Sequence, residues 1–415
     1  MKCAVVDAYG IGRFLPEALA RHGVESVHVR SEHPDIHLEY RPGDFSVDIP
    51  HDGDTAATAA RLRELGVAFV VAGAESGVLL ADALSEALGT PGHGMSRPTA
   101  RRDKYEMARA VRDAGLAAAD TIASPDPDEV VAWATAAGQW PVVLKPVASA
   151  GTDNVIFCRS EDEIRAAHAT ILGESDRYGR RNRTVVAQQF LDGDEHFVNT
   201  VSRDGVHHIV EIWRYHKRPA GDGRSINDYE HPLPPDDPTA RRLGEYVLKV
   251  MDALEIRNGS AHTEVMMTPD GPVLVESGAR LGGAHLPDVV NRCIGTDQIE
   301  RLALAIARPE EITGHRLPPY RLLTHLRYVN LISHGDGFVP TAEGFAPVRA
   351  LPSFLDMVLT TPEGKPVTRT LDLVTSPGYL YLSSDDDAQV EADYRRLREL
   401  EENGLYQSDN ARLGG

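Results

Sequence analysis

Residues 260–283 read SAHTEVMMTPDGPVLVESGARLGG, and the interpretation of the whole chain starts from them. The first half alternates, with His262, Glu264 and Met266 on one face, which is typical of a β-strand with one buried face. Pro269-Asp270-Gly271 is a turn signal, because proline and glycine favour the backbone angles that a tight turn requires. The stretch therefore predicts a β-hairpin.

The predicted hairpin brings two glutamates together. Its second strand is Pro272–Glu276, and folding about Asp270 places Glu264 opposite Glu276. Directly opposed side chains have Cβ atoms roughly 4.5–5.5 Å apart, and like charges there are destabilising. A divalent cation such as Mg²⁺ would remove the conflict, because it binds carboxylate oxygens and keeps waters and phosphates as its other ligands. Two alternatives stay open: an ordinary surface hairpin, and a register shifted by a bulge.

A glycine-rich segment with one arginine follows the hairpin. Arg280 lies among Gly278, Gly282 and Gly283, which let the backbone approach a ligand closely. A guanidinium suits bidentate contact with phosphate or carboxylate. The alternative is an arginine that only neutralises the two glutamates.

The composition of the 415 residues excludes several classes of protein. Asp and Glu number 62 against 43 Lys and Arg, and the formal net charge of -19 argues against nucleic acid or an anionic membrane as the main partner. Cys3, Cys158 and Cys293 form no CxxC or Cys/His cluster, so neither a disulfide framework nor a zinc site is indicated. The chain starts like a β-strand rather than a signal peptide, and no window is apolar enough to span a membrane, so we expect a cytoplasmic location.

The N-terminal residues predict a parallel α/β sheet, because short apolar strands alternate with helices. The predicted strands are 2–8, 26–29 and 67–72, and the predicted helices are 14–22, 56–65 and 77–88. Gly10-Ile11-Gly12 lacks the third glycine of a dinucleotide fingerprint and is interpreted as a tight turn. Glu75 follows the last of these strands, where such sheets place functional groups. The alternative for Glu75 is an acid at a helix N-terminus.

Two lysines stand at unusual places in the middle of the chain. Lys104 belongs to Arg101-Arg102-Asp103-Lys104, which opens a predicted helix that runs to about Ala114. Lys145 ends an apolar strand predicted over 142–145, although lysine is rarely buried unpaired. The loop after Lys145 has small residues, including Ser149 and Gly151, whose backbone N–H groups could surround phosphates. A simple turn with a surface lysine remains the alternative, and no Walker A motif occurs.

Two further segments carry candidate binding residues. The segment Gln189-Phe190-Leu191 and the nearby Glu195 join two units, where backbone groups could pair with an adenine edge and Glu195 with a ribose hydroxyl; a hinge without ligand is the alternative. Residues 214–219 concentrate positive charge, with Arg214, Lys217 and Arg218, and the following 221–228 predict a flexible loop over substrate. An exposed basic turn is the competing interpretation.

In this order, the motifs resemble those of the ATP-grasp carboxylate–amine ligases, over residues 1 to about 310. The GSAHTEV and ESGARLGG segments are most similar to the L-amino acid ligases that make dipeptides, and the tail to about 407 resembles their extension. The resemblance implies an α/β (α+β) ATP-grasp fold with an N-terminal parallel domain, a small lid and a larger antiparallel C-terminal domain. It implies these divisions: 1–98 N-terminal domain, 99–120 linking helix, 121–190 lid, 191–320 catalytic subdomain and 321–415 strand-rich extension.

The resemblance also implies roles for individual residues. Lys104 and Lys145 match lysines that bind the phosphates of ATP, Gln189 to Leu191 match the adenine-binding segment, and Glu195 matches the acid near the ribose. Ser149–Asp153 match the lid loop, Glu264 and Glu276 match the ligands of Mg²⁺ or Mn²⁺, and Arg280 matches the arginine at the acyl phosphate. One position departs from the pattern, because Gly278 stands where many members have an asparagine ligand.

The implied reaction is transfer of a phosphoryl group from ATP to a carboxylate, followed by attack of an amine on the acyl phosphate. The expected product is an amide that joins two amino acids, as in natural-product biosynthesis. Glu75, the basic segment and Gly282-Gly283 are candidate substrate contacts. The alternatives are a ligase for other carboxylates and a regulatory protein that binds ATP without turnover. The expected partners are small molecules, and a homodimer is common in the superfamily.

Overall fold

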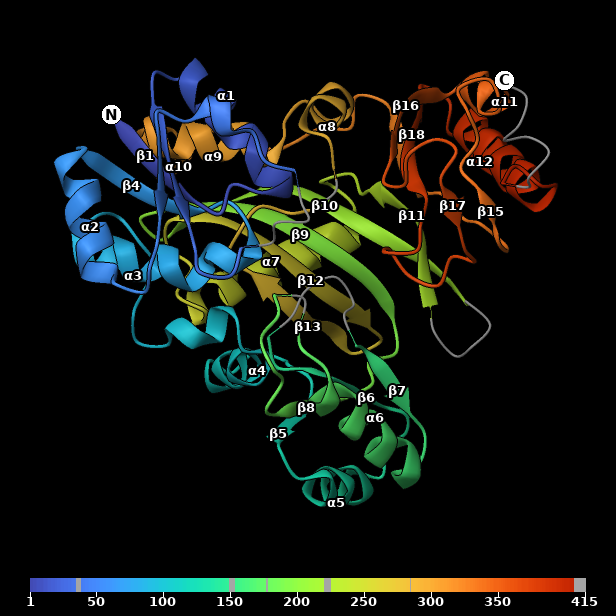
Figure 1. Cartoon of the computed structure of the whole chain (residues 1–415), viewed down its shortest axis with the longest axis horizontal. Helices are drawn as coiled ribbons and strands as arrows, with labels where there is room; N and C mark the ends of the chain where they lie inside the picture. The colour runs from blue at the N-terminus through green and yellow to red at the C-terminus, as the bar shows by residue number, and fades with distance from the viewer. Residues whose placement is uncertain (35–38, 149–153, 177, 220–224, 284, 407–415) are drawn as a thin grey trace. The chain divides into compact units, whose positions relative to one another are not determined.

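The computed structural model describes the chain except residues 35–38, 149–153, 177, 220–224, 284 and 407–415 (Figure 1). It contains two compact units. The first consists of Met1–Ile212, Pro235–Pro287 and Thr296–Tyr320, and the second of Trp213–Pro234, Asp288–Gly295 and Arg321–Gly415. The finer divisions expected from the sequence remain predictions.

The first unit begins with the predicted parallel sheet, in the order β3-β2-β1-β4 (Figure 1). Its strands are β1 Lys2–Val6, β2 Glu25–Arg30, β3 Val47–Pro50 and β4 Val67–Ala72, and its helices are α1 Leu15–Arg21, α2 Thr55–Glu64 and α3 Val78–Leu88. Strand β3 was not predicted, because it is a short edge strand in which none of the four residues is buried.

The Gly10-Ile11-Gly12 segment is a tight turn, as predicted. Gly10 has a φ of 59°, and a Cβ built on Gly12 would lie 2.5 Å from the carbonyl oxygen of Gly73. The glycines therefore allow two backbone segments to pack together at the end of β1.

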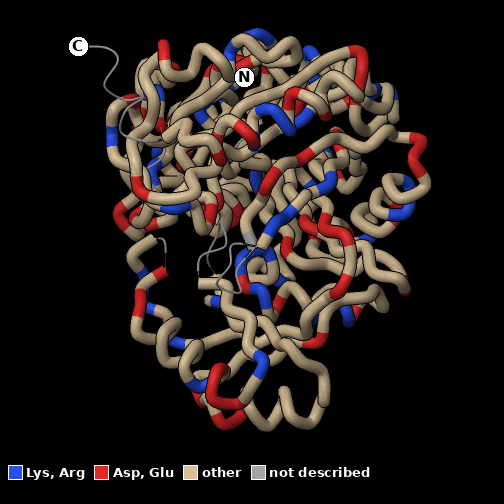
Figure 2. Tube along the Cα trace, turned by 90° about the vertical axis from the view of Figure 1, so that its right-hand side faces the viewer, with Lys and Arg blue, Asp and Glu red and all other residues tan. Residues whose placement is uncertain are grey.

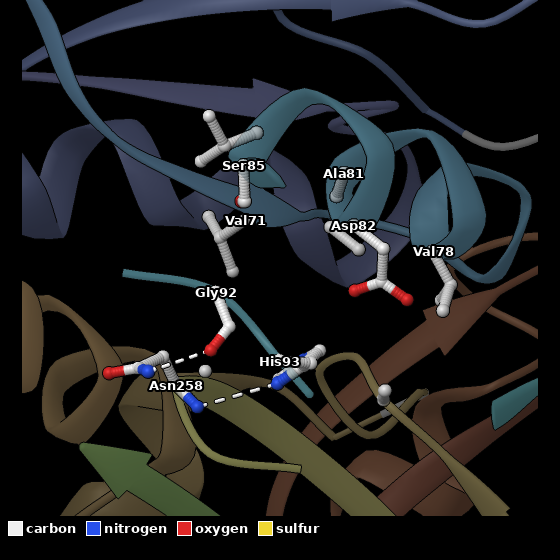
Figure 3. Close-up of a pocket in the computed structure, with 12 residues that line it drawn as sticks. Val71, Val78, Ala81, Asp82, Ser85, Gly92, His93 and Asn258 are labelled. Atoms are coloured by element: carbon white, nitrogen blue, oxygen red, sulfur yellow. Dashed lines mark hydrogen bonds between the residues drawn. The ribbon is translucent and has the colours of Figure 1, made fainter. Parts of the chain in front are cut away.

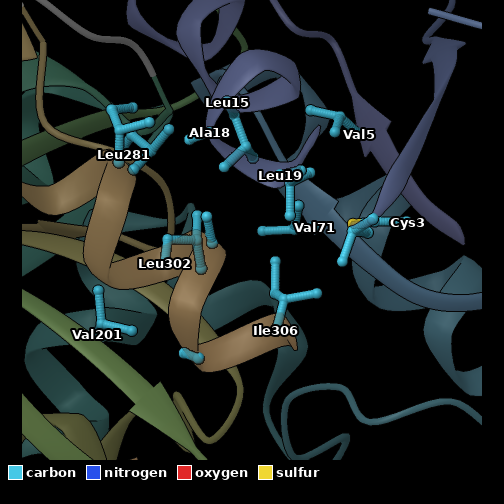
Figure 4. Packing of buried hydrophobic residues seen from close by; sticks show 14 of the residues in the cluster. Cys3, Val5, Leu15, Ala18, Leu19, Val71, Val201, Leu281, Leu302 and Ile306 are labelled. Carbon is cyan, nitrogen blue, oxygen red and sulfur yellow. The ribbon is translucent and has the colours of Figure 1, made fainter. Parts of the chain in front are cut away.

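The core of this unit joins the N-terminal sheet to a helix far along the chain (Figure 4). That helix is α9, Gln298–Ala307, which is followed by α10, Pro309–Thr313. The buried residues shared by β1, α1, β4 and α9 include Cys3, Val5, Leu15, Leu19, Val71, Leu302 and Ile306. Gly295, which has a φ of 73°, separates α9 from the helix that ends at Ile294.

A small antiparallel sheet follows, in the order β5-β8-β6-β7. Its strands are β5 Thr121–Ser124, β6 Val142–Pro146, β7 Ile156–Cys158 and β8 Val185–Gln189, and α5 Pro127–Ala137 and α6 Glu161–Gly173 pack on it (Figure 1). Asp126 and Ser160 cap the two helices by accepting hydrogen bonds from first-turn N–H groups. Alternate residues of β6 and β8 are buried against the helices, which fixes the face that this sheet turns to them.

The hairpin predicted around Asp270 is formed by β12 Gly259–Thr268 and β13 Gly271–Gly278. The predicted pairing of Glu264 with Glu276 is confirmed, but the predicted turn is wrong. Thr268 pairs with Gly271, so the loop contains only Pro269 and Asp270, which by itself would place Glu264 opposite Val275. A bulge between the pairs of Val265 and Glu264 adds the missing residue and restores the facing glutamates.

Strand β9 Asp194–Arg203 pairs with β12, and β10 Val206–Pro219 lies next to β9, in the large antiparallel sheet. The order of that sheet is β13-β12-β9-β10-β11-β14-β18-β16. The first unit also contains α4 Lys104–Asp113 and α7 Pro238–Ala253. Among the described helices, none has both the length and the apolar composition of a membrane span. Acidic and basic residues are interspersed along the trace (Figure 2).

The second unit contains the end of β10 and the remaining strands and helices. These are β11 Ser225–Pro232, β14 His325–Asn330, β15 Gly337–Phe338, β16 Phe354–Leu359, β17 Pro366–Val367, β18 Gly378–Ser384, α8 Pro287–Ile294, α11 Ala346–Arg349 and α12 Asp387–Glu402. Its core includes Val329, Leu331, Phe345, Val348, Leu380, Leu382, Val390 and Leu397.

Residues 214–219 form neither the exposed basic turn nor part of a loop, and 225–228 do not belong to the flexible loop predicted over 221–228. Residues 220–224 lie outside the described part of the chain. Strand β10 continues to Pro219, and β11 begins at Ser225 and pairs with it. The Nε atom of Arg218 lies 3.0 Å from Oδ2 of Asp228, so the two strands neutralise each other's charge. The sequence did not reveal this pairing, because the acceptor carboxylate lies on the neighbouring strand.

Candidate active site

The facing glutamates of β12 and β13 form the first part of the site. Their side chains are 30% and 27% exposed, so both are accessible to a ligand. The Nζ atom of Lys104 lies 2.8 Å from Oε1 of Glu276. On the other strand, Nε2 of His262 lies 3.7 Å from Oε1 of Glu264. A lysine therefore lies beside one carboxylate of the pair, and a histidine lies near the other.

Lys104 owes its position to the start of α4. Asp103 is the N-cap residue and accepts hydrogen bonds from the backbone N–H groups of Tyr105 and Glu106. The backbone N–H of Lys104 donates to the carbonyl oxygen of Val147, just beyond β6, at 3.1 Å. The Lys104 side chain, which is only 7% exposed, is thus held at the junction of α4 and the small sheet.

Lys145 occupies the end of β6 and is 5% exposed. Burial is the main cause that lowers the pKa of Lys145 to about 8, and the charge of Lys104 acts in the same direction. Three carboxylates oppose this shift: Glu276, Glu264 and Glu195. The two lysines and these glutamates therefore act on each other electrostatically. Their roles in binding phosphate and metal stay predictions.

A second cluster contains Glu75, Arg102 and Arg280. Nη1 of Arg102 donates to Oε1 of Glu75, and Nε of Arg280 donates to Oε2 at 2.7 Å. Nη1 of Arg280 also donates to the carbonyl oxygen of Leu281 at 2.8 Å. The Glu75 side chain, placed at the carboxyl end of β4 as expected, is thus bound by two guanidiniums.

The charges of this cluster are set by their mutual contacts. Burial opposes ionisation of Glu75, but Arg102 and Arg280 outweigh it and lower the pKa of Glu75 to about 2. Burial likewise opposes the charge of Arg102, and Glu75 outweighs it, so the pKa of Arg102 is raised. Lys104 also acts on Glu75, and Glu276 on Arg102, so the two clusters belong to one charged site.

Because Gly278 has no side chain, Glu75 and Arg280 can pack directly against its backbone. A Cβ built on Gly278 would lie 2.7 Å from Oε2 of Glu75 and 3.3 Å from Nε of Arg280. A larger residue at this position would therefore displace the ion pair. This contact gives a physical reason for a glycine at position 278 in this chain.

Gly278→Ala is accordingly expected to shift the Glu75–Arg280 pair, to lower kcat/KM about tenfold and to destabilise the protein by about 1–3 kcal/mol. Gly43→Ala is the matched control, because nothing lies within 4 Å of a Cβ built there. Steady-state kinetics and urea unfolding measure both effects. Equal behaviour of the two variants would contradict the packing argument.

Several predicted residues lie at the edges of this site or outside the described residues. Ser149 and Gly151 are among the residues that the structure does not describe. The backbone N–H of Gln189 donates a hydrogen bond to the carbonyl oxygen of Asp120 at 2.8 Å. Phe190 is 38% exposed. Leu191 is half-buried, and Glu195 lies on β9 opposite Met266. The adenine assignment stays a prediction.

Gly282 packs against the polar side chains of Asn199 and His262. A Cβ built on it would lie 2.9 Å from Oδ1 of Asn199, which accepts a hydrogen bond from Nδ1 of His262 at 2.8 Å. Nδ2 of Asn199 donates to Glu211 at 2.6 Å, so His262 has a fixed orientation. The backbone N–H of Gly282 donates to Gln298, whereas a Cβ on Gly283 would meet nothing within 4 Å.

Arg214, Lys217 and Arg218 belong to the second unit. Arg218 forms the ion pair with Asp228 described above, and Nζ of Lys217 lies 5.7 Å from the centre of the Tyr215 ring. Their predicted contact with substrate stays a prediction.

A pocket beside α3 is built from structural contacts (Figure 3). Nδ2 of Asn258 donates to the carbonyl oxygen of Gly92 at 2.8 Å, and its backbone N–H donates to Nδ1 of His93 at 3.3 Å. The fully buried Arg101 binds Oδ2 of Asp82 through Nε and Nη2, at 2.9 and 2.7 Å. These bonds fasten α3 to the segment that begins α4.

Sequence reasoning missed Arg102. Its signal is the pair of arginines directly before the N-cap residue Asp103 in an acidic chain. Arg101 turns to Asp82 within α3, whereas Arg102 turns to Glu75, just before α3, so neighbouring residues contact different parts of this segment. Only the folded backbone reveals this division.

Comparison with known proteins identifies the fold and the family. Residues 138–288 match the family model of the ATP-grasp domain. The crystal structure of an L-amino acid ligase from Bacillus licheniformis aligns with a TM-score of 0.74 and 19% identity, over 96% of this chain and 97% of that one. The ADP complex of an N5-carboxyaminoimidazole ribonucleotide synthetase aligns with a TM-score of 0.69 and 15% identity, over 96% of each chain. The fold is therefore the ATP-grasp fold, as predicted.

Dapdiamide A synthase from Enterobacter agglomerans is 30% identical over 406 residues, which are 96% of this chain and 95% of that protein. The L-arginine-specific L-amino acid ligase of Bacillus subtilis is 23% identical over 224 residues, 54% of each chain. The chain belongs to the ATP-grasp ligases that form amides, the group that contains dapdiamide synthase and the L-amino acid ligases. ATP is the nucleotide of this family.

Proposed function

We propose that this ligase joins the carboxylate of one amino acid to the amine of a second amino acid, with ATP cleaved to ADP and phosphate. The observation that carries the proposal is the pair of facing glutamates, Glu264 and Glu276, beside the buried Lys104 and Lys145. Paired carboxylates next to two cations suit a magnesium nucleotide, whose phosphates need both kinds of partner.

The residues present fit Mg²⁺. Oxygen ligands are required, and Glu264 and Glu276 offer carboxylates from adjacent strands with accessible side chains. Within the described ranges, no group of three or more His, Cys, Asp or Glu side chains converges on one point, which agrees with an ion that takes its remaining ligands from water and phosphate. When bound, Mg²⁺ would neutralise phosphate charge. Mn²⁺ could occupy the same ligands.

The chain's own residues then perform positioning and charge stabilisation. Lys104 and Lys145 hold the phosphates of ATP in line with the substrate carboxylate, and the phosphoryl group passes to that carboxylate to give an acyl phosphate. Arg280 stabilises the oxyanion that forms when the amine attacks the acyl carbon, after which phosphate leaves and the amide remains. The segment Gln189–Leu191 and Glu195 hold the adenosine, and the small sheet excludes water. Ser149 and Gly151, which lie outside the described residues, stay candidates for phosphate binding.

The three cysteines bear on the cellular location of the protein. Cys3, Cys158 and Cys293 are free and buried, as thiols of a reducing compartment usually are. We therefore propose a cytoplasmic enzyme with small-molecule substrates.

The test of this function is product identification with pools of amino acids. The protein, ATP and Mg²⁺ are expected to release ADP and phosphate only when suitable amino acids are present, and mass spectrometry is expected to detect a dipeptide. ADP formation with free acids but with no amino acid as the carboxylate donor would instead favour a ligase for other carboxylates. ATP binding without any ADP would contradict both.

A further inference from the structure

The buried guanidinium of Arg102 has one nitrogen, Nη2, that donates no hydrogen bond to the described residues. Its side chain is 5% exposed, and Nη1 is bound to Oε1 of Glu75. Nη2 is also buried, and no partner for it lies among the described residues. Buried donors are almost always satisfied, so an orphaned charged N–H inside a binding site indicates a place for a ligand acceptor.

The surroundings of Arg102 specify an anion. Arg102 and Arg280 share the single carboxylate of Glu75, which leaves the three side chains with an excess of positive charge. Each oxygen of Glu75 already binds one guanidinium. The centre of the Tyr178 ring lies 5.5 Å from Cζ of Arg102 and limits the orientations of the guanidinium. An anionic group from a substrate would both satisfy Nη2 and neutralise the cluster.

The chemistry of the reaction decides which anion fits. The phosphates have Lys104 and Lys145, which lie with the facing glutamates. The carboxylate that attacks the phosphoryl group needs free electron pairs, and a fixed ion pair with arginine would weaken it as a nucleophile. A carboxylate that stays unreacted throughout has no such conflict, and the amine donor of a dipeptide carries one.

We infer that Arg102 binds the free carboxylate of the amine-donating substrate, so that the enzyme selects an α-amino acid over a simple amine at this position. The inference rests on the proposed ligase function and names a specificity residue for it. Glu75 then serves to hold Arg102 and Arg280 in place, and Gly278 provides the space for this arrangement.

The experiment compares two amine donors with the same side chain, an amino acid and the amine that lacks its carboxylate. With wild-type protein, KM for the amino acid is expected to be roughly 10- to 100-fold below KM for the amine. In Arg102→Gln, KM for the amino acid rises to that of the amine, while KM for ATP and for the acid donor change less than about twofold. Arg102→Lys is expected to lie between, since lysine keeps the charge but loses the planar fork.

Arg109→Gln is the matched control, because Arg109 lies on α4, the helix that follows Arg102, with its side chain 51% exposed. Its KM values are expected to equal those of wild type. A rise in KM for ATP or for the acid donor in Arg102→Gln would overturn the inference, and so would equal use of both donors by wild type. Thermal unfolding of each variant separates loss of binding from loss of fold.

Failure of the proposed function has a different signature. If wild type forms no ADP with any pair of amino acids, the ligase reaction proposed above is wrong. Arg102 is then tested by binding of free amino acids to wild type and Arg102→Gln, where equal affinity overturns its assignment. If wild type does ligate amino acids and Arg102→Gln keeps the wild-type KM values, only the assignment of Arg102 is wrong.

Discussion

A Glu276→Ala protein is expected to lose at least about 10³-fold of its ADP-forming activity while keeping its fold. Glu276 faces Glu264 across the hairpin and lies 2.8 Å from Nζ of Lys104. Its removal takes away one of the two carboxylates proposed for the ion and leaves the lysine without this partner. Coupled measurement of ADP release, at saturating ATP and Mg²⁺, gives the rate.

Two further measurements make this prediction specific. ATP with Mg²⁺ is expected to raise the unfolding temperature of wild type and to raise that of Glu276→Ala much less, because a ligand stabilises only the state that binds it. Asp270→Asn is the matched control, since Asp270 is exposed in the turn of the same hairpin. Near-normal turnover of Glu276→Ala would show that the metal assignment is wrong.

The second large effect is expected from Glu75→Gln. This change leaves Arg102 and Arg280 without the carboxylate that binds both, and loss of one partner of a buried ion pair destabilises a protein by about 3–5 kcal/mol. Urea unfolding at neutral pH measures the difference from wild type. Glu64→Gln is the control, because Glu64 pairs with Arg61 on the surface and is 68% exposed, and its effect is expected below about 1 kcal/mol.

The effect of Glu75 also has a definite pH dependence. Its pKa is lowered from 4.5 to about 2 in the folded protein, so the unfolded chain takes up the proton first as the pH falls. The stabilisation is complete above pH 4.5 and decreases by about 1.4 kcal/mol per pH unit between about 4.5 and 2. The advantage of wild type over Glu75→Gln should shrink accordingly at acid pH. A constant difference between the two proteins would mean that folding does not shift the pKa of Glu75.

The sequence predicted the architecture well, because the strands and helices of the N-terminal sheet have strong periodicity. Strand β4, Val67–Ala72, is found with the predicted ends, and α3 differs from the predicted helix by one residue at one end. The short edge strands β3 and β7 were missed, because three or four half-exposed residues carry little pattern. The continuation of β10 through the basic segment was missed because its charges are neutralised from the adjacent strand.

Some residues of the candidate site could likewise be predicted from the sequence, and others could not. Lys104, Lys145, Glu264 and Glu276 could be named from the sequence, since each stands where its residue type is unusual or where strand pairing fixes its neighbour. The facing of Glu264 and Glu276 nevertheless depends on a two-residue turn and a compensating bulge. No local pattern distinguishes that combination from the symmetrical turn that the sequence indicated, although both give the same pair.

By itself, the sequence determined the order of the elements, the hairpin with its two glutamates and the two lysines, because these depend on contacts between residues close together in the chain. The tertiary structure alone decided that Glu75, Arg102 and Arg280 share one cluster and that Gly278 must be small to admit it. The physical reason is that charges 205 residues apart pair only after the separate sheets have packed, and that burial then fixes which of them remain ionised.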